Sequence, residues 1–309
     1  MKDKRLCEDT SLMKVTKYEA LGNDFLIFFD DDEEKPFGEE LAEFLCDRHF
    51  GLGADGVIRM SRAQKSRRFK MTLRNADGTL AETSGNGLRC AALAVFFEGI
   101  EKTDTYNGEI SGATEIEAAD SIVGAFCHFP SADNIASAAI EVSMGEVKIA
   151  QTKSPIEDTV AFEVNVGNPH LVICGHGFEG LDLAKIGSQE EKARPEGINV
   201  EFLDLSDLGA FPNAKFPMVV WERGVGFTKA CGSGSVASAA AIGETLLQRD
   251  SQLSEHFSYV IANPGGDLDI RLEPFTKGSY FAYLRGPANF IAEAEVLLPQ
   301  RLTGNAVHG

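Results

Sequence analysis

Two segments of the chain are apolar around almost their whole circumference, and the same short signal precedes both. One runs from Leu88 to Gly99 and follows AETSGNG, and the other runs from Ser235 to Gln248 and follows KACGSG. A helix without a polar face has to be buried on every side. The chain therefore needs two places that can enclose a helix, and we interpret the pattern as an internal duplication.

The sequence around these segments predicts strands and tight turns. MKVTKYEALGNDFLIFFD, which begins at Met13, has the pattern of strand, turn and strand, and VIRMS and FKMTLRNADG continue it. Similar pairs follow in AAIEVSMGEVKIA, DTVAFEVNVGNPHLVICG, FPMVVWERGVGF, YVIANPGGDLDIRL and SYFAYLRGPANFIAEAEVLL. GEELAEFLCDRHF, from Gly38, predicts one further helix. We expect two mostly β halves, each wrapped around one helix, because βαβ units are too few for a Rossmann domain.

Composition limits the function classes. The chain has 309 residues, 43% of them hydrophobic and 25% charged, which is typical of a globular protein. Its net charge of -18 argues against a nucleic-acid or an anionic membrane partner, because both would repel an acidic protein. A soluble acidic surface is the simplest explanation of that charge.

The amino terminus and the cysteines predict a cytoplasmic protein. MKDKRLCEDTSLMK lacks the apolar core of a secretory signal, and no run reaches the 18 or so apolar residues of a membrane helix. The six cysteines are scattered without a CxxC pair, so we expect reduced thiols and no metal site. Residues 1–12 are interpreted as a flexible leader, and a turn-rich stretch at Phe129 to Asn134 is the candidate boundary between the halves.

The repeated signal predicts an anion site. The first N–H groups of a helix have no partner inside the helix, and the helix dipole adds positive charge there. Glycines at Gly85, Gly87, Gly232 and Gly234 allow a carboxylate or phosphate to approach the backbone.

The residue before each first glycine differs, being Ser84 in one copy and Cys231 in the other. A helix amino terminus lowers a thiol pKa, so Cys231 is a candidate thiolate, although a small buried cysteine is the alternative. The hydroxyl of Ser84 is a poor base but can exchange hydrogen bonds. Cys90 lies elsewhere on its helix and is expected in the core.

Further polar residues stand isolated in strand and turn contexts, where each alone is more often a turn former than a ligand. They are Asn23, Asn75, Asn168, His170, Asn199, Glu222 and Arg223.

Taken together, these motifs resemble the diaminopimelate epimerase family. The match runs in order through KYEALGNDF, CDRHFGLGADG, NADGTLAETSGNGLRC, VGNPH, INVEF, WERGVG, ACGSG, GGDL and GPA. The resemblance implies an α/β (α+β) fold of two pseudo-symmetric domains, each a mixed β-sheet or barrel curled around a central helix. The domains would comprise residues 13–130 with about 287–309, and residues 131–286. It also implies a homodimer and an isomerase of lysine biosynthesis that needs no pyridoxal phosphate, metal or other cofactor.

The resemblance further implies the reaction, the conversion of LL-2,6-diaminopimelate to the meso isomer by α-proton removal and reprotonation. Two thiols act on opposite faces of the α-carbon in that family, and their positions here are Cys231 and Ser84. His170 and Glu222 match residues that help to set the protonation of the pair. The implied substrate-binding residues are Asn23, Asn75, Gly85, Asn86, Asn168, Asn199, Glu222, Arg223, Gly232 and Ser233.

The chain departs from the family pattern at four positions. Ser84 replaces the first thiol, Phe227 stands where an acid is common, Arg285 stands where threonine is usual, and Gly56 replaces a polar ligand of one branch. Three interpretations of Ser84 follow. The chain is a slower, asymmetric epimerase in which Ser84 acts; or a weakened or inactive form, substituted deliberately or naturally; or a one-base enzyme or racemase for another amino acid. A non-enzymatic binding protein is the fourth possibility. We take the first as the working hypothesis.

Overall fold

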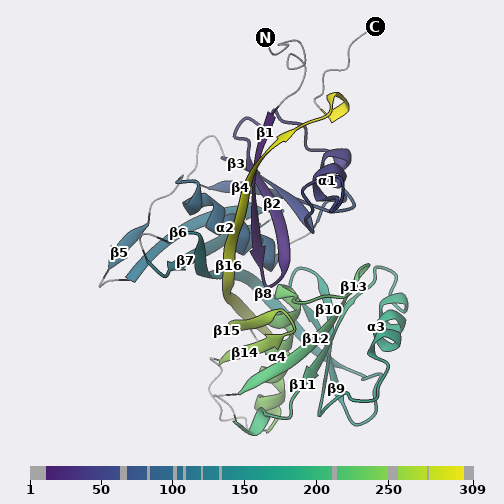
Figure 1. Ribbon diagram of the computed structural model, residues 1–309. Helices are drawn as coiled ribbons and strands as arrows, with labels where there is room; N and C mark the ends of the chain where they lie inside the picture. Colours follow the sequence, from purple (N-terminus) through teal and green to yellow (C-terminus); the bar gives the residue numbers. More distant parts are fainter. Residues whose placement is uncertain are drawn as a thin grey trace, which may run out of the picture.

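The computed structural model describes residues 12–62, 68–81, 84–99, 103–106, 109–119, 121–131, 134–210, 214–249, 257–276 and 278–302. The described strands form one continuous hydrogen-bonded sheet that closes on itself twice. Figure 1 shows the result as two stacked halves, with helix α2 enclosed in one and α4 in the other. The expected α+β fold of two similar halves around central helices is confirmed.

The first barrel closes in the order β16-β1-β2-β3-β4-β6-β7-β8, and β8 pairs back onto β16. Its strands are β1 (Leu12–Ala20), β2 (Asn23–Phe29), β3 (Gly56–Arg62), β4 (Phe69–Asn75), β6 (Glu109–Ala118), β7 (Ser121–Phe129), β8 (Ser137–Thr152) and β16 (Ser279–Leu297), with β5 (Asp104–Tyr106) paired to β6. Helix α2 (Gly85–Phe97) fills this barrel. Helix α1 (Glu39–Cys46), which connects β2 to β3 in the chain, packs on the outside of the barrel.

The second barrel closes in the order β8-β9-β10-β11-β12-β14-β15-β16. Its further strands are β9 (Val160–Asn165), β10 (Pro169–Gly175), β11 (Asn199–Asp204), β12 (Lys215–Glu222), β14 (Phe257–Asn263) and β15 (Gly266–Thr276), and the short β13 (Gly226–Phe227) pairs with β12. Helix α4 (Gly232–Arg249) fills it, α3 (Leu183–Lys192) packs outside, and two short 3-10 turns lie at Leu208–Ala210 and Gln300–Leu302.

The two barrels repeat the same sequence of strand pairings. In the first, β2–β3 and β4–β6 are parallel and the other pairs are antiparallel. In the second barrel the equivalent pairs, β10–β11 and β12–β14, are parallel and the other pairs are antiparallel. The outer helices α1 and α3 each make the crossover of the first parallel pair, and α2 and α4 make that of the second. This is the pseudo-symmetry that the duplicated motifs predicted.

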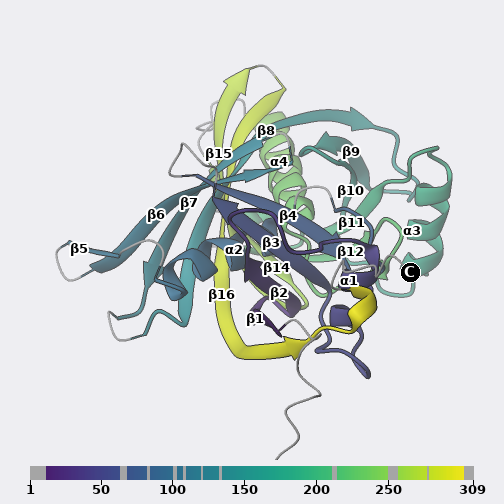
Figure 2. The ribbon, with the colours of Figure 1, turned by 90° about the horizontal axis from the view of Figure 1, so that it is seen from above.

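Strands β8 and β16 belong to both barrels. They pair from Ser279 with Lys148 to Asn289 with Ser137, and in Figure 1 β16 runs from one half into the other. Both strands contact both central helices, and Figure 2 shows these four elements from above. The division into residues 13–130 with about 287–309 and residues 131–286 stays a prediction, since both shared strands contact both helices. Of the expected leader, residues 1–12, only Leu12 is described, and it begins β1.

Both central helices begin three residues earlier than expected. The sequence predicted starts at Leu88 and Ser235, whereas the helices begin at Gly85 and Gly232. Glycine lowers helix propensity, which is why these turns were interpreted as loops. The side chain of Ser84 caps the first turn of α2, and burial of the whole turn supplies the remaining stability. The glycine motifs are therefore part of the helices themselves.

Candidate active site

The amino termini of α2 and α4 meet where the two barrels join. A Cβ on Gly85 would lie 3.4 Å from the Cα of Gly232, and a Cβ on Gly232 would lie 3.2 Å from the Cα of Gly85. A side chain on Gly232 would be crowded at this point, so the close approach of the two backbones favours glycine there. Both helix dipoles therefore direct positive potential and unpaired N–H groups to one point, as an anion site requires.

Ser84 and Cys231 occupy equivalent positions just before these helices. The Ser84 Oγ accepts a hydrogen bond from the Gly87 N–H at 3.0 Å, and the Cys231 Sγ accepts one from the Gly234 N–H at 3.4 Å. The backbone carbonyl of each residue also accepts the first i+4 bond of its helix, at 2.8 Å and 2.9 Å. The Ser84 O–H proton remains free to be donated, because capping uses only an oxygen lone pair.

A cleft of about 710 Å³ opens over the two helix termini and is lined from both barrels. Ten of the residues predicted from sequence line it: Asn23, Asn75, Ser84, Gly85, Asn86, Asn168, Glu222, Cys231, Gly232 and Ser233. Its volume is in the range of small-molecule sites. The cleft thus brings together most of the predicted site from segments far apart in the chain.

Three predicted residues do not line the cleft. His170 is completely buried behind it. Asn199 donates to the Pro169 carbonyl at 3.1 Å and accepts from the Arg223 N–H at 3.0 Å, so it anchors the turn that carries Glu222 and Arg223. The Arg223 guanidinium donates to the Glu196 carbonyl at 3.1 Å. In this structure these residues support the wall of the cleft.

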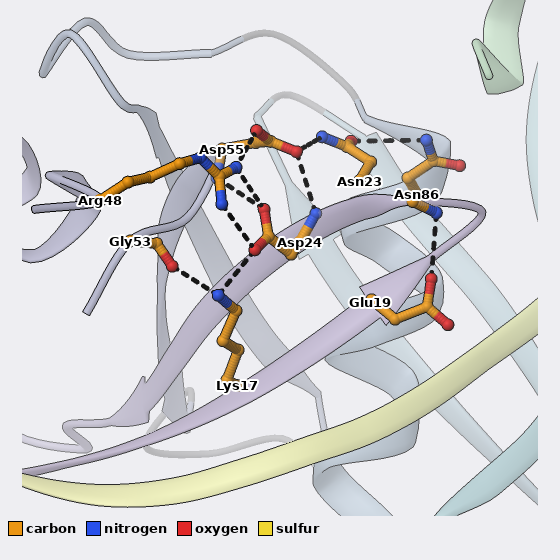
Figure 3. Close-up of polar contacts among 9 residues, drawn as sticks. Lys17, Glu19, Asn23, Asp24, Arg48, Gly53, Asp55 and Asn86 are labelled. Carbon is orange, nitrogen blue, oxygen red and sulfur yellow. Dashed lines mark hydrogen bonds and ion pairs between the residues drawn. The ribbon is translucent and has the colours of Figure 1, made fainter. Parts of the chain in front are cut away.

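A network of charges orients the amide of Asn23, as Figure 3 shows. The Asn23 Nδ2 donates to Asp55 at 2.7 Å, which leaves its Oδ1 to accept from the Asn86 Nδ2 at 3.4 Å. Arg48 bridges Asp24 and Asp55 with contacts of 2.9 Å and 2.7 Å. Burial alone would raise the pKa of Asp24, but hydrogen bonds from Arg48 and Lys17 outweigh it and lower the pKa to about 2. The Asn23 side chain is thus held by permanently charged neighbours.

Arg89 supports the first turn of α2 from inside the protein. Its guanidinium is completely buried and donates to the Asn86 Oδ1 at 2.7 Å, the Gly85 carbonyl at 3.1 Å and the Pro287 carbonyl at 3.2 Å. Burial lowers the pKa of Arg89 to about 10, so it stays charged at neutral pH. These bonds direct the Asn86 Nδ2 toward the Ala230 carbonyl, 3.3 Å away.

The environment of Cys231 differs from the sequence expectation. The helix terminus predicted a lowered thiol pKa, but burial raises the pKa of Cys231 well above its ordinary value, and the carboxylates of Glu222 and Glu201 raise it further. Hydrogen bonds from Ser233 and the Gly234 N–H offset this only in part. Cys231 is therefore a protonated thiol in the unliganded protein. The expectation of a lowered thiol pKa was wrong, because burial of the thiol and, after it, two carboxylates brought in by the tertiary structure outweigh the helix terminus.

Glu222 is also shifted. Burial raises the pKa of its carboxyl group, against a hydrogen bond from the Thr228 hydroxyl. Glu201 was missed in the sequence, where it stands between Val200 and Phe202. An acid flanked on both sides by buried apolar residues of a strand was the available signal.

Three of the four departures do not line the cleft. Phe227 is half exposed and packs edge-on against Trp221, with ring centroids 5.4 Å apart. Arg285 is exposed on β16, opposite Asp269 and Glu141. Gly56 has no room for a side chain, since a Cβ there would lie 2.7 Å from the Arg74 carbonyl oxygen. Only Ser84 changes the chemistry of the cleft.

The family model and the similar proteins found by sequence comparison share one description. The family model described as diaminopimelate epimerase matches residues 15–123 and 162–291. The chain is 33% identical over 297 residues to a diaminopimelate epimerase of Thermosynechococcus vestitus, covering 89% of this chain and 96% of that protein. It is 31% identical to the diaminopimelate epimerase of Mycolicibacterium smegmatis, covering 92% and 97%.

Solved structures show the same fold at low identity. A phenazine biosynthesis protein of the PhzF family from Bacillus anthracis has a TM-score of 0.68 at 12% identity, covering 93% of this chain and 100% of that one. A hydroxyproline epimerase from Agrobacterium vitis with bound trans-4-hydroxy-L-proline has a TM-score of 0.67 at 14% identity, covering 94% and 93%. With the double barrel, the paired helix termini and this match over most of its length, the chain belongs to the diaminopimelate epimerase family.

Proposed function

We propose that the protein is an isomerase that converts LL-2,6-diaminopimelate to the meso isomer, a step of lysine biosynthesis, without pyridoxal phosphate. The observation that carries the proposal is the placement of Ser84 and Cys231 at two equivalent helix termini that meet at Gly85 and Gly232. A carboxylate bound between these termini would hold its α-carbon between the hydroxyl and the thiol. Two proton-transfer groups on opposite sides of one carbon are what inversion requires.

The backbone supplies the carboxylate site. The N–H groups of Gly85, Asn86, Gly232 and Ser233 belong to the first turns of α2 and α4, where no helical carbonyl accepts from them. The buried guanidinium of Arg89 adds a positive charge, and among the described residues it donates to two carbonyls and one amide and to no carboxylate. A bound carboxylate would compensate this charge.

The rest of the substrate has two ammonium groups and a second carboxylate. Asn23, Asn75 and Asn168 present amides to the cleft, and Glu222 presents its carboxyl group, so ammonium and carboxylate groups both find partners. Arg223 and Asn199 shape the turn that ends the cleft on the side of the second barrel. We assign the recognition of the distal end of the substrate to this turn.

The protonation of Cys231 suggests how the reaction starts. The thiol is protonated in the unliganded protein because burial and two carboxylates disfavour the thiolate. An ammonium group of the substrate brings positive charge beside these carboxylates, and an opposite charge nearby favours the ionised form of an acid. Substrate binding would thus promote transfer of the thiol proton to solvent in the cleft, which leaves the Cys231 thiolate as the base.

Cys231 would then remove the α-proton, and the Ser84 hydroxyl would deliver a proton to the other face. The resulting alkoxide would regain a proton from solvent in the cleft. A hydroxyl is a much weaker acid than a thiol, and a serine is a poor base for the opposite direction. We therefore propose an asymmetric enzyme that is slower than one with two thiols, with His170 and Glu222 setting the protonation of the pair.

Location and assembly follow as finer proposals. The acidic charge of -18 and the reduced cysteines favour a cytoplasmic protein that binds a small molecule and no nucleic acid, and family membership favours a homodimer. No helix in the described part of the chain is long and apolar enough to cross a membrane. Sedimentation velocity would test the homodimer.

Proton NMR of the protein with LL-diaminopimelate in heavy water tests the reaction. Loss of the α-proton signal together with meso product is expected. Exchange without meso product would indicate a one-base site that lacks a far-side donor. No exchange from either isomer would refute the proposal, as would unchanged turnover in Cys231→Ala.

A further inference from the structure

A continuous line of side chains leads from the fully buried Glu201 to Cys231. Glu201 on β11 lies 2.7 Å from the Nδ1 of His170 on β10, and the His170 Nε2 lies 2.9 Å from the Asn168 Oδ1. The Asn168 Nδ2 donates to the Ser233 Oγ at 3.4 Å, and that oxygen lies 3.6 Å from the Cys231 Sγ. Glu201 does not line the cleft, yet it begins this line.

The hydrogen bonds constrain where protons lie along the line. The amide oxygen of Asn168 can only accept, so the His170 Nε2 must carry a proton. The Nδ1 then either donates to a Glu201 carboxylate, which makes His170 an imidazolium, or accepts from a protonated Glu201. The 2.7 Å contact is typical of a charge-assisted bond. Both arrangements give each nitrogen of the ring a partner and keep the pair neutral overall, so the short contact is the observation that favours the first.

The second oxygen of Glu201 has no partner among the described residues. Its Oε2 is buried, and the Glu201 side chain has no exposed surface. A buried ionised oxygen without a donor is costly. A glutamine would hold the same place without placing a charge there, so packing alone does not account for an acid at this position.

Gly234 brings the carboxylate and the thiol together. A Cβ at Gly234 would lie 2.6 Å from the Glu201 Oε1 and 3.3 Å from the Cys231 Sγ, so both groups lie against the same bare Cα. Among the other charged groups near Cys231, Glu222 comes from β12 and lies in the same cleft as Asp55 and Lys229. His170 lies behind the wall. Glu201 is thus a negative charge beside the thiol that solvent does not screen.

We propose that Glu201 is a positioning residue whose carboxylate holds His170 as an imidazolium and, through Asn168, Ser233 and its own charge, keeps Cys231 a thiol until substrate binds. This rests on Cys231 being the reactive group of the proposed function. In this proposal Glu201 sets the protonation of Cys231 without touching the substrate or the reacting atoms. It also gives a reason for the missing side chain at Gly234.

Alkylation of Cys231 by iodoacetamide as a function of pH tests the proposal, with mass spectrometry of the peptide that carries Cys231. In Glu201→Gln the apparent pKa of alkylation should fall by about one unit, which is roughly a tenfold faster reaction at a fixed pH below it. Glu201→Asp keeps the charge and should restore most of the original profile. Glu163→Gln, on the exposed side of β9, removes a carboxylate far from the cleft and should leave the profile unchanged.

Equal profiles for Glu201→Gln and the unaltered protein would overturn the proposal. Thermal melts establish that each variant is folded. Should Glu201→Gln not fold, 15N NMR of His170 in the unaltered protein decides instead. Two protonated ring nitrogens at neutral pH are expected, and a neutral tautomer would overturn the assignment. Alkylation of Cys231 and 15N NMR of His170 do not depend on turnover. Failure of the proposed reaction would instead be seen in the proton NMR experiment in heavy water, so the two failures can be told apart.

Discussion

Gly85 and Gly232 touch backbone to backbone at the point where the two barrels present their helix termini. The Cβ that alanine would add at Gly232 lies 3.2 Å from both the Gly85 Cα and the Cδ1 of Leu284. That separation is shorter than a relaxed carbon contact of about 3.5–4.0 Å. The two halves of the anion site therefore depend on two glycines that lie far apart in the sequence.

Gly232→Ala should force the termini of α2 and α4 apart and weaken binding of the substrate carboxylate. We expect KM to rise about tenfold, equivalent to about 1.4 kcal/mol, with a smaller effect on kcat. Steady-state kinetics would measure both. Gly124→Ala is the control, because a methyl group there meets open space on β7. An unchanged KM in Gly232→Ala would show that the contact does not shape the site.

Ser84→Cys should restore a thiol opposite Cys231 and raise kcat by about 10²–10⁴-fold, the usual contribution of a positioned acid or base. Ser84→Ala has the opposite effect. It removes the cap of α2, which costs about 1 kcal/mol, and it should abolish inversion while α-proton exchange at Cys231 continues. Proton NMR in heavy water follows exchange and inversion together. A Ser84→Cys variant no faster than the unaltered protein would contradict a direct role for this position.

Asp24→Asn should lower the free energy of unfolding at neutral pH and less so in acid. The pKa of Asp24 lies near 2 in the folded protein, below its unfolded value, so its contribution is present above about pH 4 and is lost as pH falls toward 2. The pair with Arg48 and Lys17 makes a loss on the order of 2 kcal/mol reasonable at pH 7.

Urea unfolding at pH 7 and pH 2.5 measures the difference for Asp24→Asn. Asp267→Asn removes an acid of a solvent-exposed pair with Lys215 and should change stability by less than about 1 kcal/mol at either pH. Equal effects of the two substitutions would mean that the network beside Asn23 is no more stabilising than a surface ion pair.

Phe227→Glu restores the residue type common in the family and should change kcat/KM by less than about threefold, because Phe227 lies outside the cleft. It should lower the free energy of unfolding by about 1 kcal/mol, since the edge-on contact with Trp221 is lost. Kinetics and thermal melts of the same preparation test both parts. A large gain in activity would show that Phe227 governs substrate choice.

Much of the architecture could be predicted from local patterns. The all-round apolarity of the two central segments required burial, and the alternating strands around them left only a sheet to enclose them. The turn at LGND, the helix near Leu41 and Leu45 and the strand that ends at Asn75 follow from residues within a few positions of one another. Most of the residues that line the cleft could also be predicted, because the asparagines and the two glycine motifs stand out against their immediate neighbours in the sequence.

What the sequence by itself determined is the set of elements and the chemical groups that they carry, because helix caps, apolar faces and turns depend on neighbouring residues. Only the tertiary structure decided how those groups behave. The fold buries the Cys231 thiol, and the pairing of β10 with β11 and of β11 with β12 places Glu201 beside His170 and near that thiol. Burial first, and the carboxylates after it, reverse the pKa shift expected from the helix terminus alone. Electrostatic energy depends on distance and burial, and neither is set by position along the chain.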